Sequence, residues 1–128
     1  MVFTGGAFGD PVALEVGGFL VPQSVGGASV ATVSYEGDLG LQGDQLAVAG
    51  RAVVDALNPL GNTFNSTASA LGLPAVGSVP GPSNLFGFDV DRFDVAAALE
   101  PGSNGTVLEL TSAEDVYLPG VVAFSVDQ

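Results

Sequence analysis

The sequence contains no cysteine, histidine, lysine or tryptophan, and its only basic side chains are Arg51 and Arg92. The absence of cysteine excludes disulfides, a thiolate nucleophile and zinc–thiolate sites. Without histidine the chain lacks the commonest general base and the commonest transition-metal ligand. Without lysine it has neither Schiff-base chemistry nor a P-loop lysine. These absences predict a protein that is not an enzyme.

Positive charge is nearly absent as well. Fourteen Asp and Glu stand against two Arg, which gives a net charge of −12. Nucleic acid and anionic membranes both need a basic surface, so we expect no nucleic-acid partner. No apolar run is long enough to span a bilayer, so we expect no membrane insertion. A divalent cation, in contrast, would be attracted.

What the sequence does have is the composition of an all-β domain. It has 128 residues, 47% of them hydrophobic, with 19 Gly and 8 Pro. That length and composition predict one domain, 1–128, with many short strands and turns. We expect an antiparallel β-sandwich of jelly-roll type, with a small closed barrel as the alternative.

Alternation of apolar and polar residues places the strands along the chain. Residues 2–21 predict two or three short strands, and 28–35 predicts the clearest one, whose uncharged faces suggest that both are covered. An Asn/Pro-rich crossover loop at 55–85 is expected to include a helical turn at 66–71, and a short turn or helix is expected at 93–99. Asn104-Gly105 predicts a hairpin turn. The predicted strands are 12–16, 19–21, 28–35, 45–49, 52–54, 85–91, 106–111, 117–118 and 121–126.

The stretch from Tyr35 to Leu46 separates its carboxylates with glycines and lies between two predicted strands. Calcium takes six to eight oxygens from carboxylates, amides and carbonyls, and glycines let the backbone turn its carbonyls inward. The spacing is not that of an EF-hand. The stretch therefore predicts either a calcium site or a solvated acidic turn. The calcium ligands we expect are Glu36, Asp38, Asp44, Asn62, Asn65, Asp89 and Asp91.

A catalytic interpretation of these carboxylates has little support in the sequence. A glycosidase pair needs a cleft with the two carboxyl groups some 5 to 10 Å apart, together with aromatic stacking surfaces. The only tyrosines are Tyr35 and Tyr117, and tryptophan is absent. No Gly-x-Ser-x-Gly motif and no histidine serve a serine nucleophile.

Five short motifs lie along the chain, namely Glu36-Gly37-Asp38, Gly43-Asp44, Asn58-Pro59, Phe64-Asn65-Ser66-Thr67 and Gly87-Phe88-Asp89. Together they resemble a domain of unknown function in large secreted bacterial cell-surface proteins of the adhesin type. The resemblance covers most of the chain from residue 30 onward. It implies an extracellular β-sandwich and no established chemistry.

Taken together, these features predict a non-enzymatic structural or adhesive module, extracellular or at the cell surface, stabilised by calcium. No signal peptide is visible after Met1, so a cytosolic protein is the other option unless the chain is part of a longer secreted one. A self-assembling filament or surface-layer subunit, completed by strand addition, is the first alternative. A carbohydrate-binding module is the second. The expected partners are other copies of the chain or neighbouring domains, and a glycan in the last case.

Overall fold

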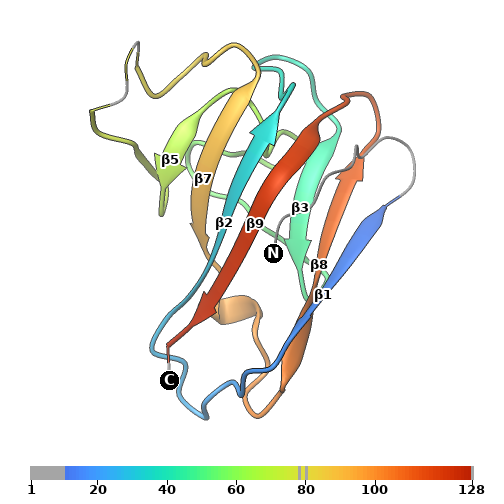
Figure 1. The fold of residues 1–128 in the computed structure, drawn as a ribbon, viewed down its shortest axis with the longest axis vertical. Helices are drawn as coiled ribbons and strands as arrows, with labels where there is room; N and C mark the ends of the chain where they lie inside the picture. Colours follow the sequence, from blue (N-terminus) through green and yellow to red (C-terminus); the bar gives the residue numbers. More distant parts are fainter. Residues whose placement is uncertain (1–10, 78, 80, 128) are drawn as a thin grey trace.

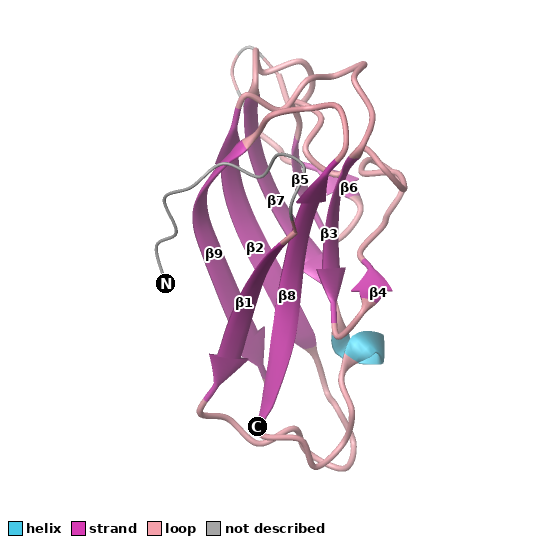
Figure 2. Cartoon of the chain, turned by 90° about the vertical axis from the view of Figure 1, so that its right-hand side faces the viewer, coloured by secondary structure: helices cyan, strands magenta, loops and turns pink. Residues whose placement is uncertain are grey.

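The computed structural model describes residues 11–77, 79 and 81–127 and is a β-sandwich (Figures 1 and 2). Within this part of the chain, two sheets pack face to face, and the one helical element is a short 3-10 helix, η1 (Ala96–Ala98). The strands are β1 (Val12–Gly17), β2 (Ala28–Tyr35), β3 (Asp44–Val48), β4 (Arg51–Ala52), β5 (Ala68–Ala70), β6 (Leu73–Pro74), β7 (Phe88–Asp94), β8 (Gly105–Ser112) and β9 (Leu118–Val126).

The two sheets have the strand orders β1-β8-β3-β4 and β6-β5-β7-β2-β9. The neighbouring strands are antiparallel except for β5 and β7, which run parallel. The predicted sandwich is therefore confirmed, with one parallel pair that the antiparallel prediction did not include. That pair arises because the chain crosses from one sheet to the other after β4 and enters the second sheet at its far side.

The strands run between two distinct ends of the sandwich. At the upper end in Figure 1, the loop 36–43 joins β2 to β3, and β8 turns back into β9. Asp44, Asp89 and Asp115 lie buried here, and we call this the acidic end. The opposite end carries the 3-10 helix and the turns into β2 and β8. The division matters because the two halves of the interior differ in chemistry.

The apolar core fills the middle of the sandwich and its end opposite the acidic one. Alternate residues of β2, β3, β7 and β8 point inward there, which is the period-2 pattern of a strand with one covered face. The largest fully buried apolar side chains are Tyr117, Phe64, Phe93, Leu46, Leu108 and Leu110. Phe64 and Tyr117 stack with ring centroids 4.3 Å apart and close the core toward the acidic end.

Most of the predicted strands are confirmed, with shifts of a few residues, and the exceptions have local causes. Residues 66–71 form no helical turn, because Ala68–Ala70 pairs with β7 as β5 and positive φ angles at Ser66 (62°) and Leu71 (54°) bracket it. Residues 19–21 form no strand. Instead, the Val21 N–H donates to the Ser103 carbonyl at 2.8 Å, and the buried Val21 side chain joins the core.

Three further expectations are corrected or refined. Asn104-Gly105 is no hairpin turn, since Gly105 already begins β8 and the chain arrives from the 3-10 helix. Residues 117–118 and 121–126 belong to one strand, β9, whose register against β2 shifts beside Pro119. Such a shift is the position at which a strand accommodates a proline. Predicted strands before residue 11 lie outside the described residues.

β7 carries its apolar and acidic residues on unexpected faces. Asp89, Asp91 and Phe93 point into the sandwich, while Phe88 and Val90 are each 37% exposed on the outer face. The outer face of β2 is covered only in part, since Ser29 is 8% exposed and Tyr35 is 48% exposed, so the expectation that both faces of 28–35 are covered does not hold along the whole strand. The buried half of β7 therefore brings two carboxylates into the interior.

Candidate functional site

The structure divides the seven predicted calcium ligands into two groups. Glu36 and Asp38 are exposed on the loop 36–43, and Glu36 adopts a positive φ of 64° at the end of β2. The other five are buried inside the sandwich at or near the acidic end, namely Asp44, Asn62, Asn65, Asp89 and Asp91. The fold thus brings the predicted ligands to one end of the molecule, but it does not arrange all seven around a single metal position.

Asp89 is the best-bonded of the buried carboxylates. It is fully buried, and its two oxygens accept the backbone N–H groups of Asn65 at 3.0 Å, Ser66 at 3.0 Å and Thr67 at 2.9 Å. Burial raises the pKa of Asp89 to about 6, against the lowering effect of these three bonds. Asp89 therefore holds the loop 63–67 inside the sandwich, and both of its oxygens take part in this structural role.

Ser66 extends the same anchor to the loop that follows β2. Its hydroxyl donates to the Gly37 carbonyl at 2.6 Å and accepts the Gly87 N–H at 2.8 Å. The positive φ of Ser66 turns its backbone N–H toward Asp89. Gly37 leaves no room for a side chain, since a Cβ there would lie 2.4 Å from an Asp89 carboxylate oxygen. Three chain segments thus meet at one carboxylate.

Asp44 and Asn62 form a second, less complete cluster. Asp44 is fully buried at the start of β3, and its Oδ1 accepts the Phe64 N–H at 2.8 Å. The Asn62 amide nitrogen donates to the Leu39 carbonyl at 3.2 Å. Asp44 Oδ2 and Asn62 Oδ1 are buried without any hydrogen-bond partner. Burial raises the pKa of Asp44 to about 6, against the lowering effect of the backbone N–H groups of Phe64 and Thr63, and repulsion from Asp115 and Asp89 adds to the shift.

Asp91 lies deeper, next to hydroxyl groups of the neighbouring strands. Its Oδ1 accepts the Ser69 hydroxyl at 2.6 Å, while its Oδ2 has no partner. Thr32 faces Asp91 across the β2–β7 ladder, and its hydroxyl is likewise buried without a partner. Burial raises the pKa of Asp91 to about 7, and nearby Asp89 and Asp55 raise it further.

The remaining predicted ligand, Asn65, is used inside the crossover loop. Its amide nitrogen donates to the Leu57 carbonyl at 2.8 Å, and its Oδ1 accepts the Thr67 hydroxyl at 2.7 Å. Asn58 is similarly engaged, donating to the Ser69 hydroxyl at 3.0 Å. These amides fix the path of the loop through the interior, as Asn side chains do in turns.

Asp115 is the buried carboxylate that sequence reasoning missed. It is 3% exposed, its Oδ1 accepts the Val116 N–H at 2.7 Å, and its Oδ2 accepts the Asp38 N–H at 3.3 Å. Its position in the turn between β8 and β9 is the one signal that could have found it, because that turn meets the loop 36–43 at the acidic end. The sequence alone gives no distance between them.

No basic side chain balances these carboxylates. The Arg51 guanidinium donates to the Ala97 carbonyl at 2.6 Å, and the Arg92 Nε donates to the Ser29 hydroxyl at 3.1 Å on the outer face. These are the only Arg or Lys residues in the chain. Among the described residues, no three acidic side chains lie close enough to hold a metal ion between them. Any cation here would need amide or carbonyl oxygens as well.

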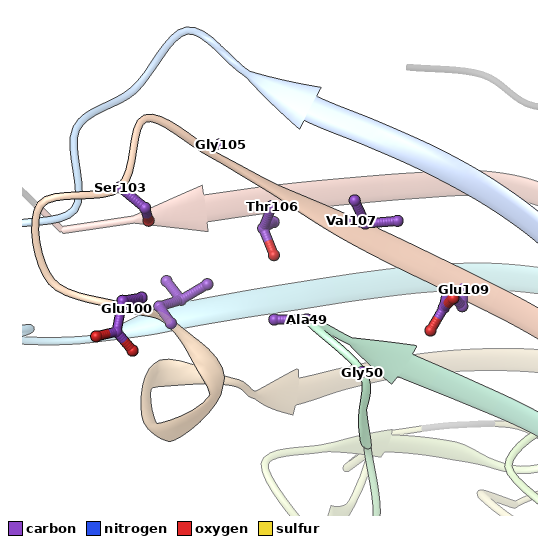
Figure 3. A pocket seen from close by; sticks show the side chains of 9 residues that line it. Ala49, Gly50, Glu100, Ser103, Gly105, Thr106, Val107 and Glu109 are labelled. Atoms are coloured by element: carbon purple, nitrogen blue, oxygen red, sulfur yellow. The ribbon is translucent and has the colours of Figure 1, made fainter.

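The hollows on the outer surface have a different character. A shallow groove of about 410 Å³ runs between the start of β8 and the Ala49–Gly50 turn, with Glu100 at one end and Glu109 at the other (Figure 3). Its lining includes Val107 and no aromatic side chain. A sugar ring would find no stacking surface there, so the groove does not favour the carbohydrate-binding alternative.

Comparison of the chain with protein families, curated proteins and solved structures finds no match. The resemblance to secreted surface-protein domains stays a prediction. No helix within the described residues is long and apolar enough to cross a membrane. The function must therefore be inferred from the arrangement of strands and buried polar groups.

Proposed function

We propose that the chain is a non-enzymatic structural or adhesive module of an extracellular protein, and that it serves as one link in an extended chain of domains. The observation that carries the proposal is the direction of the first and last strands within the described residues. β1 starts beside Leu110 near the acidic end, and β9 finishes beside Ala28 at the opposite end. In Figures 1 and 2, the two strands run along the same axis in the same direction.

This arrangement suits a domain that bears tension. A pull on the start of β1 and the end of β9 would act along both strands. β1 is paired with β8 through six residue pairs, and β9 is paired with β2 through eight. Because the hydrogen bonds of antiparallel ladders lie across the strands, they would be loaded together in shear rather than broken singly.

The buried polar groups support a structural rather than a catalytic role. Both carboxylate oxygens of Asp89 accept backbone N–H groups, and Asp91 is only 1% exposed. A general acid or base must reach a substrate proton within hydrogen-bond distance, which a sealed side chain does not do. The sequence has no histidine, cysteine or lysine to take that role instead.

Single-molecule force spectroscopy tests the proposal, and the lack of native cysteine makes the attachment points selectable. One variant carries Ala13→Cys and Ser125→Cys, exposed positions near the outer ends of β1 and β9. The control carries Ala13→Cys and Ala113→Cys, both near the acidic end, so that pulling peels β1 from β8 one bond at a time.

We expect the first variant to unfold at a clearly higher force than the control at the same pulling speed. Matched chemical stability of the two variants, measured by urea denaturation, ensures that only the pulling direction differs. Equal unfolding forces in the two directions would contradict a load-bearing design and remove the observation on which the proposal rests.

A second candidate function, self-assembly by strand addition, has its own support. Among the described residues, β9 pairs only with β2, so a nine-residue strand forms the edge of its sheet. An apolar patch lies on the outer face beside it, where the rings of Tyr35 and Phe88 are 5.5 Å apart and Leu118 is 43% exposed. Unpaired edges with apolar neighbours are templates for another chain.

Light scattering on concentrated protein tests this alternative. We expect larger species from the native chain and their loss in Val121→Lys, which places a charge on the exposed side of β9. Val107→Lys makes the same charge change on the other sheet, where Val107 is equally exposed to within a few percent. A monodisperse monomer at high concentration would rule out strand addition.

A further inference from the structure

Two buried oxygens at the acidic end lack partners and belong to neighbouring residues. Asp44 and Asn62 are paired through a backbone β-bridge, so their side chains are neighbours. Asp44 is fully buried and Asn62 is 8% exposed, yet Asp44 Oδ2 and Asn62 Oδ1 make no hydrogen bond. Buried acceptors without partners are uncommon and costly, so each requires an explanation.

A third oxygen-bearing group reaches the same place from the other side. Asp44 also pairs across the β3–β8 ladder with Ser112, whose hydroxyl donates to the Asp115 carbonyl. Asp44 therefore lies between Asn62 on one side and the turn that carries Asp115 on the other. The Asp115 backbone carbonyl thus lies within hydrogen-bond reach of the residue that is paired directly with Asp44.

The loop 36–43 covers this cluster. The Leu39 carbonyl accepts the Asn62 amide N–H at 3.2 Å, and the Asp38 N–H donates to Asp115 Oδ2 at 3.3 Å. Both bonds are long for their type, and each oxygen keeps a free lone pair. The groups around the cluster are thus two carboxylates, one amide oxygen and one backbone carbonyl.

These oxygens match a hard divalent cation. Two carboxylates neutralise a double positive charge, and calcium takes amide and carbonyl oxygens together with carboxylates in irregular geometry. Magnesium demands near-ideal octahedral geometry, which an irregular loop and two sheet ends do not offer. Both arginines are engaged elsewhere, so the chain supplies no positive side chain of its own here.

We infer that the acidic end binds one calcium ion under the loop 36–43, with Asp44 Oδ2 and Asn62 Oδ1 as its inner ligands and Asp115 as the second carboxylate. Of the seven ligands expected from the sequence, only Asp44 and Asn62 belong to this site. Asp89 and Asn65 are committed to holding the crossover loop. The inference rests on the proposed function only in assuming that the ion has a structural and not a catalytic role. The force experiment is done without calcium, so failure of one proposal is distinguishable from failure of the other.

Thermal melts of the whole chain test binding directly. The protein is first freed of metal with EDTA and then melted in calcium chloride, magnesium chloride or sodium chloride at equal ionic strength. At a free calcium concentration about a hundred times the Kd, we expect the melting temperature to rise by about 5 to 10 °C. Magnesium should produce a smaller rise. A calcium effect no larger than that of sodium would overturn the inference.

Terbium luminescence locates the ion without relying on stability. Terbium(III) takes calcium sites and emits when a nearby tyrosine is excited. Tyr117 lies close enough to Asp44 and Asp115 to feel both charges, whereas Tyr35 lies on the outer face of its sheet. We therefore expect tyrosine-sensitised emission that calcium displaces, that Tyr35→Phe preserves and that Tyr117→Phe abolishes. The reverse pattern would place the ion elsewhere.

Substitutions of the proposed ligands complete the test. Asn62→Ala and Asp115→Asn should each weaken calcium at least tenfold by isothermal titration calorimetry. Asp91→Asn changes another buried carboxylate with an unpartnered oxygen, outside the site, and should leave the affinity unchanged. If Asn62→Ala fails to fold, Asp115→Asn and the terbium emission of the Tyr35→Phe and Tyr117→Phe variants still test the site. Equal calcium affinity in Asp115→Asn and the native chain would refute the site.

Discussion

Replacing Asp89 with alanine should be the most damaging single substitution on β7. The carboxylate accepts three buried backbone N–H groups, those of Asn65, Ser66 and Thr67, at 2.9 to 3.0 Å. Each donor left unsatisfied in the interior costs about 1 to 3 kcal/mol. The sum, about 3 to 9 kcal/mol, approaches the whole stability of a typical domain, about 5 to 15 kcal/mol. We expect Asp89→Ala to be largely unfolded or to unfold at much lower urea concentration.

Asp89→Asn separates the loss of a bond from the loss of the side chain. The amide oxygen can still serve two of the three N–H groups, but the amide nitrogen then faces the N–H that the second carboxylate oxygen accepted. One unsatisfied donor costs about 1 to 3 kcal/mol, and the neutral side chain recovers part of it because burial no longer removes a charge from water. The asparagine variant should therefore be destabilised less than the alanine variant.

Urea denaturation at pH 7, followed by far-ultraviolet circular dichroism and tyrosine fluorescence, measures these differences. The chain has no tryptophan, so the fluorescence signal comes from its two tyrosines, of which Tyr117 is buried. Asp94→Asn is the matched control, because Asp94 is an exposed carboxylate on the same strand that accepts one backbone N–H, that of Ala96 at 3.0 Å. We expect the control to change stability by less than about 0.5 kcal/mol. A loss of less than about 1 kcal/mol in Asp89→Ala would refute the anchoring role.

Two further predictions use the same interior. Burial, with repulsion from Asp89 and Asp55, raises the pKa of Asp91 from 3.8 to about 7. The folded state therefore keeps a proton that the unfolded state has released, and stability should fall by up to about 4 kcal/mol as pH rises from 4 to 7. Urea denaturation across this range measures how the free energy of unfolding changes with pH, and we expect part of that pH dependence to disappear in Asp91→Asn. An unchanged pH dependence in this variant would contradict the raised pKa of Asp91. Gly37→Ala should cost about 1 to 3 kcal/mol, because its Cβ would lie 2.4 Å from an Asp89 oxygen, whereas Gly40→Ala meets nothing within 4 Å and should be neutral in the same melts.

Alternation in the sequence predicts the long strands well, because they have one face on the core. β2 begins and ends where the period-2 pattern of 28–35 does, and β8 differs from its predicted range by one residue at each end. The short strands β5 and β6 were missed. Their residues, Ala68–Ala70 and Leu73–Pro74, carry no strand pattern of their own. β5 is a strand because β7 offers it a partner, and β6 pairs in turn with β5.

The direction in which β7 faces could not be predicted from its pattern. Phe88-Asp89-Val90-Asp91 alternates cleanly, and the usual rule turns the acidic residues toward water. Here the acidic residues turn inward, because the crossover loop presents three backbone N–H groups and the Ser69 hydroxyl to them. Those donors come from residues more than twenty positions away, so no local window contains them.

The candidate site was predictable in part for the same reason. Sequence spacing brought Asp44 and Asn62 into the expected set, since both border the glycine-rich stretch or the Asn-rich loop. It also included Glu36, which the structure leaves exposed, and omitted Asp115. Which carboxylates meet depends on the turn between β8 and β9 folding back over β3. That contact spans more than sixty residues of chain.

The polar half of the interior gives the fold something that an apolar core would not, namely a fixed register for β7. Shifting β7 by one residue against β2 would turn Val90 and Arg92 inward. The three N–H groups that Asp89 now serves would lose their acceptor, and the Arg92 guanidinium would enter the interior. Each of these changes costs several kcal/mol on its own. An apolar strand at this position would slip at far lower cost, so the buried carboxylates are best understood as the part of the sequence that selects one pairing over its neighbours.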